Sequence, residues 1–198
     1  MNLANKITIF RIILAVIILV ILVFPWFQVG VEWQTFLIFN KITVNMMYIV
    51  AGILFIIAAF TDFLDGHVAR SKNMVTDFGK TMDAIADKVL VNGVLIILAA
   101  HGFIPLVVPV VVISRDIIVD SIKMVVGNTG KVVAASVVAK AKTICMMSGI
   151  TLILFYNLPF ELIGINVADI MIIVATVLSV VSGCQYYLVN RDMIFQQK

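Results

Sequence analysis

The amino-acid sequence predicts an all-α integral membrane protein with six transmembrane helices, and three observations support this prediction. Hydrophobic residues make up 63% of the 198-residue chain and charged residues only 13%, whereas soluble domains are about 45–50% apolar and about 25% charged. The apolar residues gather in six runs, each close to the roughly 20 residues that a helix needs to cross a bilayer. Most lysines and arginines lie at or near those ends of the runs that would face the same side of a membrane.

The six apolar runs cover, in order, residues 7–27, 43–62, 83–100, 105–126, 142–157 and 167–189. Lys6 and Arg11 precede the apolar stretch of residues 12–24 as in a signal peptide, but no cleavage site of small residues follows this stretch, so we expect an uncleaved membrane helix. Residues 28–42 join the first two runs. Two polar stretches, residues 64–81 and 127–141, join runs two and three and runs four and five. The length leaves no room for a separate soluble domain, so we expect one membrane domain over residues 1–198.

Charge placement predicts that both termini face the cytoplasm (N-in/C-in). In that orientation only Lys41 among the lysines and arginines lies on the outer side, which agrees with the positive-inside rule. We therefore expect a multi-pass protein of the cell membrane, with membrane lipids and no nucleic acid among its partners. Arg115 lies inside the fourth run, so it must face a polar cavity or pair with Asp116 or Asp120.

One segment, residues 62–87, concentrates the acidic side chains of an otherwise apolar chain. It reads Asp62-x2-Asp65-Gly66-x2-Ala69-Arg70-x8-Gly79-x3-Asp83-x3-Asp87. A carboxylate at the centre of a bilayer costs about 2.5–3.5 kcal/mol, so four of them at one depth need partners that offset their charge. The simplest partner is a divalent metal ion.

The spacing of the four aspartates favours a shared site. Asp62 and Asp65 are three residues apart and Asp83 and Asp87 four apart, so each pair lies on one face of a helix. Hard oxygen ligands suit Mg²⁺ or Mn²⁺, and two such ions would clamp a displacement at phosphorus. Arg70 is a good phosphate ligand. A structural acidic cluster, as in a divalent-cation transporter, is the alternative interpretation.

The full pattern resembles the motif of the CDP-alcohol phosphatidyltransferase family, with all eight of its specified positions filled. The resemblance implies the CDP-alcohol phosphotransferase fold, a homodimer, and attack of an alcohol on the β-phosphorus of CDP-diacylglycerol with release of CMP. It implies that Asp87 is the general base. It also implies two sets of ligands: Asp62, Asp65, Asp83 and Asp87 for the two metal ions, and Asp62, Gly66, Ala69, Arg70 and Gly79 for the nucleotide and pyrophosphate.

A second group of residues bears on the acceptor alcohol. Arg115, Lys123, Lys140 and Lys142 would bind the phosphate of an anionic acceptor; the alternative for these cations is ordinary positive-inside charge. Residues 115–118, 140–143 and the pattern Asn5-x2-Thr8-x2-Arg11 resemble the phosphatidylglycerophosphate synthases of the family, which implies glycerol 3-phosphate as acceptor. The pattern at Asn5 also fits an interfacial helix with capping residues. Departures at Ala4, Asp116, Lys123 and Ala139 keep inositol phosphate and serine as alternative acceptors.

Overall fold

A computed structural model of the chain describes residues 3–39, 42–71, 77–127 and 137–195. The side chains of residues 3–5, 62–71, 77–78, 80 and 192–195 lie outside this description. The described residues form six α-helices: α1 (Leu3–Val23), α2 (Met46–Ser71), α3 (Asp77–Ala100), α4 (Val107–Gly127), α5 (Val137–Leu154) and α6 (Val167–Phe195). Two 3₁₀ turns, η1 (Trp26–Val29) and η2 (Phe160–Ile163), and a two-stranded antiparallel hairpin, β1 (Thr35–Ile38) and β2 (Ile42–Asn45), complete the described elements.

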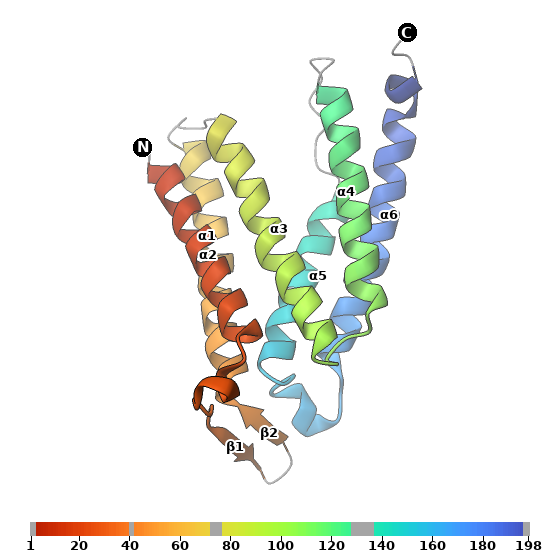
Figure 1. Cartoon of the computed structure of the whole chain (residues 1–198). Helices are drawn as coiled ribbons and strands as arrows, with labels where there is room; N and C mark the ends of the chain where they lie inside the picture. Colours follow the sequence, from red (N-terminus) through yellow and green to blue (C-terminus); the bar gives the residue numbers. More distant parts are fainter. Residues whose placement is uncertain (1–2, 40–41, 72–76, 128–136, 196–198) are drawn as a thin grey trace.

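Consecutive helices run in opposite directions, so α1 begins and α6 ends at the same end of the bundle (Figure 1). We call this the terminal end, and the opposite end, which carries β1 and β2, the hairpin end. The helices form two groups, α1–α3 and α4–α6. The two groups lie close together near the hairpin end and diverge toward the terminal end (Figure 1). An even number of antiparallel helices thus places both ends of the described chain on one side.

Close packing between small and branched side chains joins the helices in pairs. The most extensive contacts are between α5 and α6, α1 and α2, α4 and α6, and α1 and α3. At the α5–α6 contact, a Cβ on Gly149 would lie 2.9 Å from Ile172 Cδ1 and 3.3 Å from the Ile172 backbone nitrogen. Small residues allow such close approach between membrane helices, where van der Waals contact rather than water exclusion drives association.

Three helices are long and apolar enough to cross a membrane by length and composition: Lys6–Val23 in α1, Val137–Leu154 in α5 and Val167–Arg191 in α6. Helix α2 has a shorter apolar part, Met46–Thr61. Helix α3 carries Asp83 and Asp87, and α4 carries four charged residues from Arg115 to Lys123. The six helices of the sequence prediction are present among the described residues, and three of them have the length and composition of membrane-spanning helices.

The structure departs from the sequence prediction in three places. Residues 64–81 were expected as a polar connection, but α2 continues to Ser71 and α3 begins at Asp77, so most of the acidic motif is helical. Hydropathy reports where apolar side chains stop, and a helix can continue past that point. Residues 28–42 contain β1, which the all-α prediction omitted. Thr8 lies in the second turn of α1 with its side chain buried, so it is not a helix cap.

The close approach of α5 and α6 yields a prediction about stability. Gly149→Val should lower the free energy of unfolding by about 1–3 kcal/mol, because the added side chain must displace Ile172 in a packed contact. Thermal unfolding in detergent measures the change. Gly127→Val is the matched control, because a Cβ at Gly127 meets nothing within 4 Å. Equal stability of the two variants would contradict the packing argument.

Candidate functional site

A polar cavity of about 240 Å³ lies between α3, α4, α5 and α6 in the half of the bundle near the terminal end. The structure brings Asp87 together there with the four cations that the sequence assigned to an acceptor phosphate: Arg115, Lys123, Lys140 and Lys142. The other described residues that line the cavity are Lys88, Asp116, Asp120, Ala139, Thr143 and Tyr186. Five cations against three carboxylates favour an anionic ligand.

Helix α6 holds the guanidinium of Arg115 in a fixed position. Arg115 Nε donates to the Ser179 carbonyl oxygen at 3.0 Å, and Nη2 donates to Ser182 Oγ at 2.6 Å. Both serines are fully buried. A Cβ on Gly183 would lie 2.9 Å from Arg115 Cγ, so the absence of a side chain at this position makes room for the arginine stem. Small residues on α6 thus bind and make room for a charged side chain from α4.

The carboxylate of Asp116 joins two of the cations. Its Oδ1 accepts hydrogen bonds from Arg115 Nη1 at 2.8 Å and from Lys142 Nζ at 2.7 Å. The three side chains are only 11–16% exposed. The expectation that Arg115 lines a polar cavity or pairs with a neighbouring aspartate is therefore confirmed, with Asp116 as the partner. An ion cluster of this kind ties α4 to α5 at the level of the cavity.

A second carboxylate, Asp120, pairs with Lys88 from α3. Lys123 lies farther away, with Nζ 3.9 Å from Asp120 Oδ1, which is beyond hydrogen-bonding distance. Lys123 Nζ instead lies 5.5 Å from the centre of the Tyr186 ring, and Arg115 Cζ lies 5.9 Å from the same ring. Both distances are within the range of cation–π attraction. Tyr186 therefore helps to hold two cations above one face of α6.

The acidic motif is only partly visible. Asp83 and Asp87 lie one turn apart on α3, and Asp83 accepts a hydrogen bond from Arg11, whose side chain is 1% exposed. This contact ties α1 to α3. Gly79 lies in the first turn of α3. The backbone of the other motif residues belongs to the last turns of α2, and their side chains lie outside the described part: Asp62, Asp65, Gly66, Ala69 and Arg70. The metal and nucleotide sites therefore stay predictions.

Sequence reasoning did not assign Lys88, Asp120 or Tyr186 to the site. Asp116 and Asp120 lie four residues apart within an apolar run, which is a signal for a shared polar face. Tyr186 carries no such signal, because an aromatic residue in a membrane helix is common. For Arg11, a cation within an apolar run, the sequence left both a site role and an interfacial helix possible. Its pairing with Asp83 rules out a purely interfacial role for this part of α1.

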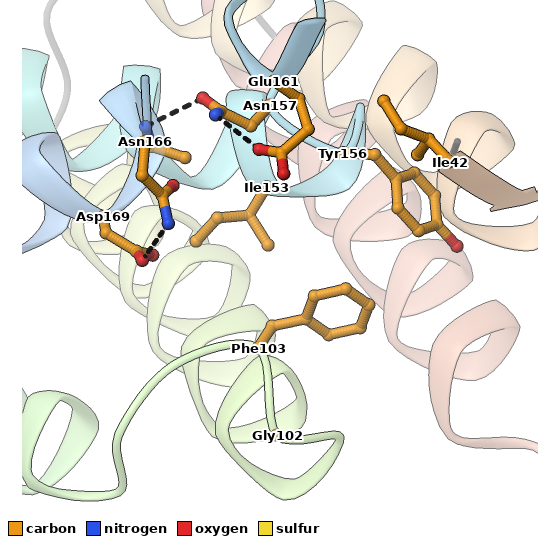
Figure 2. A pocket seen from close by; sticks show the side chains of 10 residues that line it. Ile42, Gly102, Phe103, Ile153, Tyr156, Asn157, Glu161, Asn166 and Asp169 are labelled. Carbon is orange, nitrogen blue, oxygen red and sulfur yellow. Dashed lines mark hydrogen bonds between the residues drawn. The ribbon is translucent and has the colours of Figure 1, made fainter. Parts of the chain in front are cut away.

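A second polar cavity, of about 300 Å³, lies at the hairpin end (Figure 2). Asn157 Nδ2 donates to Glu161 Oε2 at 3.0 Å and to the Ile165 carbonyl oxygen at 2.8 Å, and its Oδ1 accepts from Ala168 N at 3.0 Å. Asn166 donates to Asp169 in the same connection. These side chains are engaged in holding the link between α5 and α6, which indicates a structural role.

Comparison with known proteins places the chain in a family. Residues 1–181 match the family model described as CDP-alcohol phosphatidyltransferase, and the chain belongs to this family. It is 39% identical to a protein of Bacillus subtilis over 98% of this chain and 97% of that relative. It is 36% identical to one of Mycoplasma genitalium over 75% and 63%, and 31% identical to one of Rickettsia bellii over 69% and 76%. Each carries the name CDP-diacylglycerol–glycerol-3-phosphate 3-phosphatidyltransferase.

The ion cluster at Asp116 yields a second stability prediction. Asp116→Asn should lower the free energy of unfolding by about 3 kcal/mol, because it leaves the buried charges of Arg115 and Lys142 without their shared carboxylate. Thermal unfolding in detergent measures the loss. Glu32→Gln removes an exposed carboxylate and should leave stability unchanged. A further Lys142→Met substitution should recover part of the loss, and failure to do so would argue against charge pairing as the cause.

Proposed function

We propose that this member of the CDP-alcohol phosphatidyltransferase family transfers the phosphatidyl group from CDP-diacylglycerol to sn-glycerol 3-phosphate. The products are phosphatidylglycerophosphate and CMP. The observation that carries the proposal is the meeting of Asp87, the last aspartate of the family motif, with four cations in one cavity. The relatives named for this reaction, one of which aligns with nearly the whole chain, support the same conclusion.

The cavity suits a small phosphorylated alcohol. Its volume of about 240 Å³ is below the roughly 300–1,000 Å³ of pockets for drug-sized ligands. Three of the five N–H groups of Arg115 bond described residues, which orients the guanidinium and leaves two N–H groups for a phosphate. Lys123 and Lys140 are exposed in the same cavity. A zwitterionic acceptor without a phosphate, such as serine, would give these cations no phosphate to bind.

Asp87 is the proposed general base. Its carboxylate lines the cavity that holds the acceptor, so it can take the proton from the acceptor hydroxyl as the oxygen attacks the β-phosphorus. The bond from that phosphorus to the oxygen bridging it to CMP then breaks, and CMP leaves with the electron pair.

The nucleotide and metal sites complete the proposal. Asp62 and Asp65 lie near the end of α2 and Asp83 and Asp87 near the start of α3, and both helices pack on α1. Carboxylate oxygens fit Mg²⁺ or Mn²⁺, and two such ions would neutralise charge on the pyrophosphate when bound. Arg70 would bind the pyrophosphate, and Gly66, Ala69 and Gly79 would leave room for the nucleotide. The contact of Asp83 with Arg11 would orient one metal ligand.

We also propose six membrane crossings in a single domain over residues 1–198, with the terminal end in the cytoplasm and the protein in the plasma membrane as a homodimer. Helices of 18–29 residues are about 27–44 Å long, which ranges from slightly below to well above the roughly 30 Å thickness of the hydrocarbon layer. Apart from Arg115, near the middle of α4, the lysines and arginines within the six helices lie in the half near the terminal end, whereas Glu32, Glu161 and Asp169 lie at the hairpin end.

Release of CMP by the purified protein tests the reaction. With CDP-diacylglycerol and Mg²⁺ or Mn²⁺, CMP should appear with glycerol 3-phosphate and not with inositol phosphate or serine. Asp87→Asn should lower kcat by about 10²–10⁴-fold, because an amide cannot accept the proton, while binding of CDP-diacylglycerol is retained. Asp169→Asn is the matched control at the hairpin end. Turnover with another alcohol would overturn the acceptor assignment, and unchanged turnover in Asp87→Asn would overturn its role as base.

The fixed position of Arg115 predicts that its loss changes the KM of the acceptor and not that of the lipid donor. Arg115→Ala should raise the KM for glycerol 3-phosphate about 10- to 100-fold, the effect of losing a hydrogen bond to a charged group. Gly183→Ala should raise it less, because its Cβ displaces Arg115 without removing charge. Steady-state kinetics should show an unchanged KM for CDP-diacylglycerol in both variants. Arg191→Ala, an exposed arginine of α6, is the control. A rise in both KM values would contradict a site specific for the acceptor.

A further inference from the structure

We propose that the described residues 26–39 and 42–45, which we call the boundary segment, lie in the polar–apolar boundary of the bilayer at the hairpin end and contact phospholipid there. The segment comprises η1, β1, β2 and the residues between them. This inference concerns contact with lipid and does not depend on the reaction proposed above.

The boundary segment exposes large apolar side chains outside the six helices. Phe27 is 81% exposed, Phe39 75% and Leu37 65%, and Val29, Val31 and Phe36 are exposed as well. Glu32 is the one ionisable carboxylate or cation among the described residues of the segment. Exposed large apolar side chains that gather on a folded protein mark an interaction site.

The length of α1 sets the depth of the segment. Its 21 residues are about 32 Å long, close to the roughly 30 Å thickness of the hydrocarbon layer, so the chain leaves α1 near the boundary. Trp26 follows there and donates from Nε1 to the Ile21 carbonyl oxygen at 2.8 Å. Its ring meets that of Trp33 edge to face at 5.8 Å. Tryptophan is enriched at this depth, where its ring is apolar and its N–H is polar.

The hairpin limits how deeply the boundary segment can enter the bilayer. Strands β1 and β2 form a two-stranded sheet within the described chain, with Thr35 opposite Asn45 and Ile38 opposite Ile42. The outer edges of such a sheet carry backbone groups that need water or headgroup partners, so the hairpin cannot enter the hydrocarbon layer. An isolated two-stranded hairpin is also marginal in water. The boundary satisfies both requirements.

A groove on α1 continues the surface toward the hydrocarbon layer and indicates which molecule covers it. This groove has a volume of about 380 Å³ and is lined by apolar residues only: Val16, Leu19, Val20, Val23, Phe24 and Pro25. Val23, Phe24 and Pro25 also line the cavity that contains Trp26 and Trp33. The occupant that fits is a phospholipid, with an acyl chain along α1 and its ester region beside the two indole rings.

Tryptophan fluorescence tests the inference directly, because the chain has two tryptophans and both lie in the segment. The whole protein is placed in nanodiscs of phosphatidylcholine that carries bromine either near the ester groups or near the methyl ends of the acyl chains. Bromine near the esters should remove most of the fluorescence, bromine near the methyl ends should remove less, and iodide in the buffer should remove little.

A variant with a matched control strengthens the test. Leu37→Asp combined with Phe39→Asp should lose quenching by lipid and gain quenching by iodide, whereas Val189→Asp, which alters a 75% exposed residue of α6, should behave as the native chain. In the native chain, strong quenching by iodide would show a water-exposed segment, and protection from both quenchers would show cover by protein, such as a second copy. Stronger quenching by bromine at the methyl ends would place the segment in the hydrocarbon layer. Each of these results would overturn the proposal.

Discussion

The cluster of Arg115, Asp116 and Lys142 is the interaction on which the arrangement of α4, α5 and α6 depends. A single charge in the apolar interior of a membrane protein is costly, and each of these side chains is at least 84% buried. The cost is offset only when α4 and α5 meet at Asp116 and α6 presents Ser179 and Ser182 to the guanidinium. Three helices must therefore take one register relative to each other. The same constraint fixes the cations where an anionic ligand can meet them.

A comparable constraint acts on the other three helices. Arg11 is almost fully buried in α1 and pairs with Asp83 of α3, while α1 packs along α2. The two groups of helices meet closely near the hairpin end and diverge near the terminal end (Figure 1). Lys88 of α3 crosses between the groups to reach Asp120 of α4. Ion pairs thus join helices at the level of the cavity, where the apolar packing of the hairpin end gives way to polar side chains.

The sequence predicts the number of helices and much of the cavity, and the reason is physical. Charges are rare in apolar runs, so Arg115, Lys142 and Asp87 could be selected as candidate residues from the sequence, and the structure places all three around one polar cavity. The helix ends could not be predicted in the same way, because α2 passes ten residues beyond its last clearly apolar part. The hairpin was missed because β1 is four residues long and its exposed side chains do not alternate with polar ones. Tyr186 gave no signal, because its role depends on contacts between α4 and α6.

The two ends of the bundle meet different requirements of the same membrane. At the hairpin end, two features limit the proposed depth of the boundary segment in the bilayer. Its apolar side chains favour leaving water, and its strand edges need polar partners. At the terminal end α3 reaches Asp87 about 15 Å along its axis from Asp77, and α4 places Arg115 about 18 Å from Gly127. The cavity therefore lies within the length of the helices rather than at their tips. In the proposed reaction a lipid-linked donor would reach such a depth from the bilayer, and a small soluble acceptor would need a polar route lined by cations, a role that we propose for Lys123 and Lys140. The proposed depth of α1 and α2 at the hairpin end would thus also fix how far below the membrane surface the two substrates meet.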